Sequence, residues 1–200
     1  MMNAHTARGR TARRRMETKD VVLIALFCAI IVVLGLVPPV DLGVAGVPIT
    51  LQTLGVMLAG AVLGPVRGAL ACALVVLLTI AGLPVLAGGR GGFGVIPGPT
   101  GGYLLGWIPG AFVTGLLVTV LATRPRSRLA RQAATAAACL VGGILVVYAL
   151  GVPWTSVSTG LSLRQSTVTA LYFLPGDAVK AVVAGLVAHN VRQAYPIERR

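Results

Sequence analysis

Residues 101–123 read GGYLLGWIPGAFVTGLLVTVLAT, a stretch without a single charged side chain. Crossing the hydrocarbon core of a bilayer takes about 20 predominantly apolar residues. Comparable segments lie on both sides of this one, although two of them are short. We therefore predict an all-α polytopic membrane protein with six transmembrane helices, at 20–37, 51–64, 67–82, 101–123, 128–151 and 175–191.

The overall composition supports a membrane protein. Hydrophobic residues make up 56% of the chain and charged residues only 11%, with a mean hydropathy of +0.89, whereas soluble domains carry about 25% charged residues. The net charge of +12 comes from short basic clusters between apolar segments, not from one amphipathic face, which argues against nucleic-acid binding. The three cysteines lie singly in apolar runs and are expected to be inert packing residues.

Lysine and arginine predict the orientation, because short cytoplasmic loops are enriched in them. With six spans, the basic clusters of residues 8–19, 124–131 and 192–200, together with Arg67, fall on one side. The opposite loops, 38–50, 83–100 and 152–165, hold few positive charges. We expect a bacterial inner-membrane protein with both termini cytoplasmic: a disordered basic tail at 1–18, a membrane domain at 19–195 and a short tail at 196–200.

One pair of ionisable side chains falls inside a predicted span. Asp177 and Lys180 are three residues apart, on one face of a helix that Pro175 is well placed to start. The first turn of this helix faces the outer loops, which contain Arg90. Arg90 and Lys180 could hold a carboxylate while Asp177 accepts N–H bonds. Alternatively, Asp177 caps the helix and pairs with Lys180, or Lys180 extends outward to the interface.

The sequence offers no catalytic constellation. His5 lies in the tail and His189 near the cytoplasmic end of the last helix, far from Asp177. Neither a metal-ligand cluster nor a phosphate-binding loop occurs. We predict that the chain is not an enzyme and uses no cofactor or metal, and that any ATP hydrolysis belongs to another subunit.

Four short motifs stand in a fixed order along residues 19–191. They read VPITLQTL at 47–54, AGGRGG at 87–92, GPTGGYL at 98–104 and LPGD at 174–177, the last followed by Lys180. In these motifs the chain resembles the biotin-specific S components of energy-coupling-factor (ECF) vitamin transporters, the BioY family. The resemblance implies the six-helix S-component fold, with a biotin pocket on the extracytoplasmic side beneath the first and third connecting loops.

The resemblance also implies roles for individual residues. Asp177 would bind the ureido ring of biotin, and Arg90 with Lys180 its carboxylate. Thr50 and Gln52 would line or close the pocket, and Tyr103 would stack on the bicyclic ring. Thr50 could equally cap the second helix, and Tyr103 could anchor the chain at the membrane interface.

S components work with a transmembrane coupling subunit and two ATPase subunits. Ala25 and Ala29 form a small-xxx-small pair on the first helix that could dock on the coupling subunit or pack within the chain. The arginine-rich tail would meet anionic lipid. Three alternatives remain open at this point: an S component for another vitamin, a solitary biotin facilitator, and a purely structural membrane protein.

Overall fold

The computed structural model describes residues 16–41, 46–121 and 127–195. The predicted basic tail falls largely outside these residues, and the tail at 196–200 falls wholly outside them. Within the described chain, β-structure is limited to two isolated bridges, Val40 with Ile49 and Leu86 with Arg90. The rest of the regular structure is helical: α1 (Thr18–Gly35), α2 (Gln52–Leu63), α3 (Pro65–Ile80), η1 (Phe93–Val95), α4 (Gly101–Leu121), α5 (Arg128–Leu140), η2 (Val141–Val146), α6 (Val147–Thr159), α7 (Leu163–Leu171) and α8 (Leu174–Ala194).

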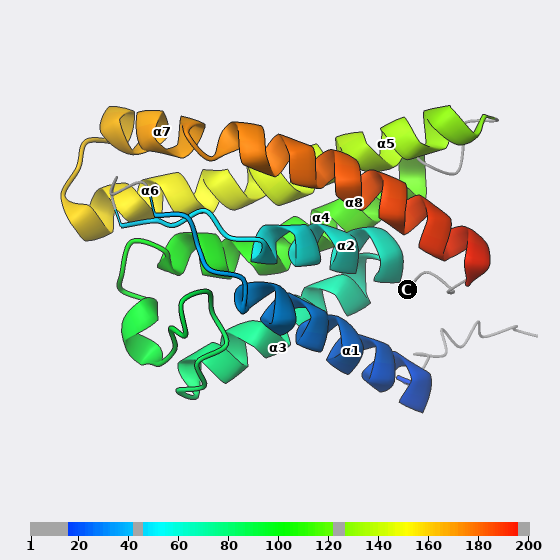
Figure 1. Ribbon diagram of the computed structural model, residues 1–200, viewed down its shortest axis with the longest axis horizontal. Coiled ribbons are helices and arrows are strands. Elements are labelled where there is room, and N and C mark those ends of the chain that lie inside the picture. The colour runs from blue at the N-terminus through cyan, green and yellow to red at the C-terminus, as the bar shows by residue number, and fades with distance from the viewer. Residues whose placement is uncertain (1–15, 42–45, 122–126, 196–200) are drawn as a thin grey trace, which may run out of the picture.

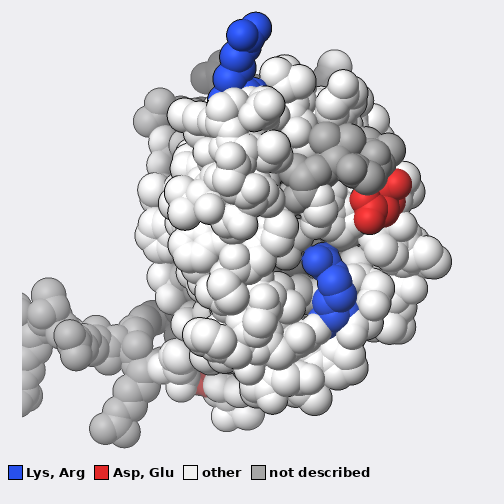
Figure 2. Space-filling view, turned by 90° about the vertical axis from the view of Figure 1, so that its left-hand side faces the viewer, with Lys and Arg blue, Asp and Glu red and all other residues white. Residues whose placement is uncertain are grey.

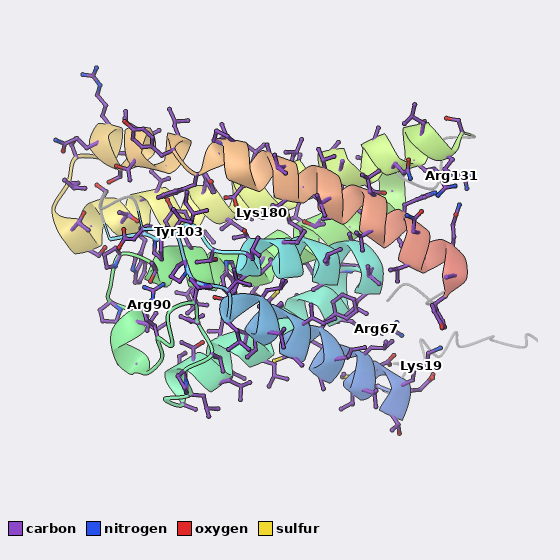
Figure 3. The ribbon with its side chains drawn as sticks, viewed as in Figure 1. Lys19, Arg67, Arg90, Tyr103, Arg131 and Lys180 are labelled. Atoms are coloured by element: carbon purple, nitrogen blue, oxygen red, sulfur yellow. The ribbon has the colours of Figure 1, made fainter. Side chains whose placement is uncertain are left out.

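The helices lie side by side along the long axis of the molecule (Figure 1). One end, here called the loop end, carries the described residues between α1 and α2, between α3 and α4, and between α6 and α7. The opposite end, the terminal end, carries the starts of α1 and α5 and the end of α8. Lys19, Arg67 and Arg131 lie toward the terminal end, and Arg90 lies toward the loop end (Figure 3). Figure 2 shows the loop end as a largely uncharged surface.

Several helices are long and apolar enough to cross a membrane. Three qualify alone among the described residues, and α7 with α8 qualifies as one span bent by 52°. Helices α2 and α3 have 12 and 16 residues, about 18 and 24 Å, whereas the hydrocarbon core is about 30 Å thick. Most of α2 is buried by the other helices, so its ends need not meet lipid. The three helices that qualify alone are Thr18–Gly35, Gly101–Leu121 and Arg128–Thr159. The protein is therefore a multi-pass, all-helical membrane protein.

The predicted outer loop at 152–165 is wrong for most of its length. The helix that begins at Arg128 continues through a π-helical turn, η2, and ends only at Thr159. Gly160 stops it, because its left-handed φ of 72° favours glycine. A capping box between Ser162 and Gln165 then starts α7, which the prediction missed.

A buried ion pair joins the starts of two helices at the terminal end. Asp20 of α1 lies 2.5 Å from Arg67 of α3, and both side chains are almost fully buried. From its position in the sequence, Arg67 was predicted to be an ordinary cytoplasmic loop charge. Instead it sits in the first turn of α3, and the pair fixes where α1 meets the α2–α3 hairpin.

Candidate ligand-binding site

A pocket opens at the loop end, among α2, α4, α6 and α8. Residues just before α2 and residues between α3 and α4 also line it. Its polar residues come from α2, α4, α6, α8 and the segments before α2 and α4, and its walls are apolar or aromatic. The lining residues are Val47, Pro48, Ile49, Thr50, Gln52, Thr53, Leu86, Arg90, Thr100, Tyr103, Leu104, Trp107, Val147, Tyr148, Phe173 and Asp177.

Asp177 is the acceptor at the centre of the site. It is 4% exposed, in the first turn of α8, which Pro175 helps to start. Its Oδ1 accepts hydrogen bonds from Lys180 Nζ at 2.7 Å and from the Thr53 hydroxyl at 3.1 Å, and its Oδ2 accepts one from the Tyr148 hydroxyl at 2.7 Å. A carboxylate oxygen can accept two hydrogen bonds, so Oδ2 retains capacity for a ligand N–H.

Lys180 is turned away from the pocket and is fully engaged. Its Nζ donates to the Thr50 carbonyl at 2.6 Å, the Thr53 hydroxyl at 3.1 Å and Asp177 Oδ1 at 2.7 Å. An ammonium has three N–H donors, so none remains for a ligand. The suggested outward extension of Lys180 is not what the structure has, because the residue is 8% exposed.

Thr50 and Asp177 do not act as helix caps. The N-cap of α2 is Leu51, and no side chain caps that helix. Thr50 instead offers its backbone carbonyl to Lys180. The side chain of Asp177 accepts from three other side chains, one of them its neighbour on α8, so its partners make a polar network across helices and not a cap.

Arg90 is the cation that faces the pocket. It ends a tight turn through Gly88 and Gly89, whose φ values of 76° and 69° favour glycine, and its Nε donates to the Ala87 carbonyl at 3.2 Å. Its two terminal amino groups have no hydrogen-bond partner among the described residues. Partial burial lowers the pKa of the guanidinium and Asp41 acts in the opposite direction; arginine nonetheless stays charged in proteins. Arg90 is therefore free to bind an anion in two-pronged fashion.

Gln52 lines the pocket, but its side-chain amide is hydrogen-bonded to the backbone of neighbouring segments. Its Nε2 donates to the carbonyls of Ile31 and Val85 at 3.2 and 3.0 Å, and its Oε1 accepts from the Ala87 backbone N–H at 2.9 Å. These bonds tie α1 and the loop before α4 to the start of α2. Gly35 makes room for them, because a Cβ there would lie 2.8 Å from Gln52 Nε2. Gln52 thus supports the loop that carries Arg90.

Two tyrosines form the aromatic side of the pocket. The rings of Tyr103 and Tyr148 meet edge to face, with centroids 5.7 Å apart, an arrangement favoured by the aromatic quadrupole. Tyr148 is the second residue of α6, just after η2, and π-helical turns often occur at functional sites. Tyr103 stands where α4 and α6 come closest, since a Cβ on Gly151 would collide with its ring. The tyrosines thereby join the apolar wall to the Asp177 network.

Ala25 and Ala29 lie outside the pocket, on the outer surface of α1. Both are exposed, as are Val22, Leu26 and Val33 at 59%, 51% and 59%. The residues of α1 that pack inward are others, among them Phe27, Cys28 and Ile31. The small pair is therefore available to a partner and is not used for packing within the chain.

Sequence comparison identifies the family to which these residues belong. Residues 6–197 match the BioY family. The chain belongs to that family. It is 50% identical over 182 residues to the biotin transporter BioY of Rhizobium etli, covering 91% of this chain and 97% of the relative. It is 53% identical over 187 residues to the biotin transporter BioY of Rhodobacter capsulatus, covering 89% and 95%.

A solved structure has the same fold. The crystal structure of the S component for biotin from an ECF-type ABC transporter superposes with a TM-score of 0.80 at 32% identity, covering 90% of this chain and 95% of that one. The fold is thus the S-component fold. The pocket is lined by five of the six residues predicted for it, Asp177, Arg90, Thr50, Gln52 and Tyr103, while Lys180 lies behind Asp177.

Two members of the network, Thr53 and Tyr148, were not among the predicted site residues. Thr53 stands within the 47–54 motif, three residues after Thr50, and the helical period would have put it on the same face. Tyr148 gave no such signal, because it lies on α6, beyond a π-helical turn that the sequence did not predict.

Proposed function

We propose that this chain is the substrate-binding S component that captures biotin on the extracytoplasmic side of the membrane for ECF-type uptake. The observation that carries the proposal is the polarity of the pocket: a buried carboxylate, Asp177, with capacity for another N–H, and a guanidinium, Arg90, with free donors. Biotin offers the matching groups, ureido N–H donors on an apolar bicyclic ring and a carboxylate on a flexible chain.

In this proposal the three charged residues do not have the roles predicted from the sequence, in which Arg90 and Lys180 both bind the ligand carboxylate. Asp177 Oδ2 accepts a ureido N–H beside Tyr148, and Trp107, Phe173 and Tyr103 surround the rings. Arg90 binds the carboxylate. Lys180 neutralises Asp177 and keeps it in place, since its donors are all engaged within the chain.

In this proposal the chain crosses the bacterial inner membrane six times, through α1, α2, α3, α4, α5 with α6, and α7 with α8. The basic terminal end is cytoplasmic, in keeping with the distribution of lysine and arginine. In a cysteine-free background, Phe93→Cys should react with a membrane-impermeant reagent only from outside, and Ser127→Cys only from the cytoplasmic side. Labelling of both from one side would contradict this topology.

The partners proposed for transport are a transmembrane coupling subunit and two ATPase subunits. The exposed face of α1 around Ala25 and Ala29 supports docking there, because small residues allow helices to approach closely. The arginine-rich tail, proposed to meet anionic lipid, lies outside the described residues. The chain itself performs capture and no chemistry.

Calorimetry on the purified full chain tests the proposal. Biotin should bind the chain alone, and Asp177→Asn should weaken binding about ten- to a hundred-fold, because a charge-assisted hydrogen bond contributes about 1.5–3 kcal/mol. Ser158→Ala at the loop end is the matched control and should bind normally. Normal binding by Asp177→Asn, or preference for another vitamin in competition, would refute the assignment. Uptake that is equal with and without the coupling and ATPase subunits would favour a solitary facilitator.

A further inference from the structure

The turn that carries Arg90 is held at its base by a side chain from another helix. Residues 86–90 form this turn, which two backbone hydrogen bonds between Leu86 and Arg90 close, at 3.0 and 3.2 Å. On either side of Leu86, Gln52 of α2 donates to the Val85 carbonyl and accepts from the Ala87 N–H. A primary amide has a donor and an acceptor side by side, so this side chain pairs with the backbone as a neighbouring strand would.

Two successive hydrogen bonds lead from Gln52 to the guanidinium of Arg90. The Ala87 N–H donates to Gln52 Oε1 at 2.9 Å, and the Ala87 carbonyl accepts from Arg90 Nε at 3.2 Å. Ala87 and Gln52 are 0% and 1% exposed, so water does not compete for the first of these bonds. The position of the Ala87 backbone, and with it the direction of the Arg90 side chain, therefore depends on Gln52.

The end of α1 holds Gln52 in its turn. Its Nε2 also donates to the Ile31 carbonyl of α1 at 3.2 Å. Gly35, the last residue of α1, lies so close that a Cβ there would be 2.8 Å from Gln52 Nε2 and 3.0 Å from the Val85 carbonyl oxygen. Three segments thus meet at one amide group: α1, the start of α2 and the segment before α4. Any side chain at residue 35 would displace that amide.

Gln52 has no means of recognising a carboxylate directly, although it lines the pocket. Both N–H groups of its amide donate to carbonyls of the chain. What it could still offer a ligand is its carbonyl oxygen, an acceptor to which a carboxylate has no hydrogen to donate. An effect of Gln52 on the recognition of a negative charge must therefore pass through Arg90, which lines the same pocket.

We propose that Gln52 and Gly35 are positioning residues that set the preference of the pocket for a negatively charged ligand by holding Arg90 in place. The inference rests on the proposed function, in which Arg90 binds the carboxylate of biotin. Without the bonds of Gln52, the ligand itself would have to order the Arg90 side chain, and ordering one long side chain on binding lowers affinity about two- to twelvefold. A ligand without the charge does not use Arg90 and is spared this loss.

Calorimetry of the purified full chain with biotin and with its carboxamide, which lacks the negative charge, tests the proposal. Gln52→Met has a similar length and removes the three hydrogen bonds. Gly35→Ala displaces Gln52 from the side of α1, without changing a residue that lines the pocket. Both should weaken biotin about two- to twelvefold and leave carboxamide affinity unchanged. In an Arg90→Ala background, neither should change the ratio of the two affinities further, because the residue they position is gone.

Two matched controls keep Arg90 in place. Gly94→Ala makes the same change as Gly35→Ala in the segment between α3 and α4, where a Cβ would meet nothing within 4 Å. Trp154→Phe removes two hydrogen bonds from a side chain to that segment, to the carbonyls of Ile96 and Gly98, beyond the Arg90 turn. Both should retain the wild-type ratio of biotin to carboxamide affinity.

Three outcomes would overturn the proposal. Equal losses for the two ligands in Gln52→Met and Gly35→Ala would show that these residues support only the part of the pocket that both ligands share. A wild-type ratio in both variants, while Arg90→Ala lowers it, would show that Arg90 needs no positioning. An unchanged ratio in Arg90→Ala would refute the proposed carboxylate site, and this inference with it. If thermal unfolding shows that Gln52→Met does not fold, Gly35→Ala decides the question.

Discussion

Removing the two cations near the pocket should impair the protein in different ways. Arg90 has free donors at the pocket, whereas Lys180 donates to three acceptors within the chain. Arg90→Ala therefore removes a partner of the ligand carboxylate. Lys180→Met removes the counter-charge of a buried carboxylate. Biotin and its carboxamide, which lacks the negative charge, separate the two effects.

For Arg90→Ala, the loss can be estimated from the bonds removed. A charge-assisted hydrogen bond contributes about 1.5–3 kcal/mol, so biotin affinity should fall about ten- to 150-fold. The carboxamide should bind the wild type weakly and lose little more, because it never gained the charged interaction. Arg90→Lys should retain part of the affinity, since a lysine keeps the charge but not the planar fork.

For Lys180→Met, the estimate concerns stability first. Asp177 would be left buried without its counter-charge, and breaking a buried pair costs about 3–5 kcal/mol. Biotin and the carboxamide should then lose affinity by the same factor, because the common ureido site is damaged. The double variant Asp177→Asn with Lys180→Met should regain much of the stability, as neutral partners no longer need each other.

The assay is calorimetry with both ligands in detergent, together with thermal unfolding of each variant. The diagnostic quantity is the ratio of biotin to carboxamide affinity. It should collapse in Arg90→Ala and stay at the wild-type value in Lys180→Met. If Lys180→Met lowers this ratio while Arg90→Ala leaves it unchanged, Lys180 binds the carboxylate and the present assignment is refuted.

Further predictions concern three other contacts. Tyr148→Phe removes a hydrogen bond to the pocket carboxylate that is present without ligand and should destabilise the chain by about 1.5–3 kcal/mol, because a hydrogen bond to a charged group contributes that much; an unchanged free energy of unfolding would contradict this contribution. Ala25→Leu with Ala29→Leu should abolish uptake in cells and leave biotin binding by the purified chain intact, whereas lost binding would make the pair part of the internal packing. Asp20→Asn should destabilise the chain by about 3–5 kcal/mol, because Arg67 would stay buried without its counter-charge; denaturation with Arg67→Met as the paired variant measures it.

The helical composition, and five of the residues that line the pocket, could be predicted from the sequence. The apolar segments predicted the helices, and the spacing of Asp177 and Lys180 placed them on one face of α8. What the spacing could not give was the direction of each charge toward the pocket or away from it. That direction depends on Thr53 of α2 and on Thr50, two residues before α2, which are 127 and 130 residues away from Lys180 along the chain. Hydropathy patterns contain no such long-range information.

The region after residue 140 shows a different limit. Its apolar run predicted one helix that ends near Gly151, just before Pro153. In the membrane-embedded bundle, close packing against Tyr103 makes the glycine useful and the helix continues past both residues. The capping box at Ser162 and Gln165 was readable and would have predicted α7. The π-helical turn η2, which precedes Tyr148, had no such signal in the sequence.

The hydrogen bonds of Lys180 within the chain also help to explain how the pocket can be stable in a bilayer both without and with a bound ligand. A lone buried carboxylate would be costly in a low-dielectric bundle, but Asp177 is already paired and hydrogen-bonded before any ligand arrives. The uncharged ureido ring then adds no net charge at depth. In the proposed binding mode the ligand's one formal charge meets Arg90, in the loop at the open end, where Asp41 also acts on the guanidinium. Lys180 thus balances the charge of Asp177 at the deep end, and the ligand would balance the charge of Arg90 at the shallow end. The same helix bundle can therefore be stable both without and with a bound ligand.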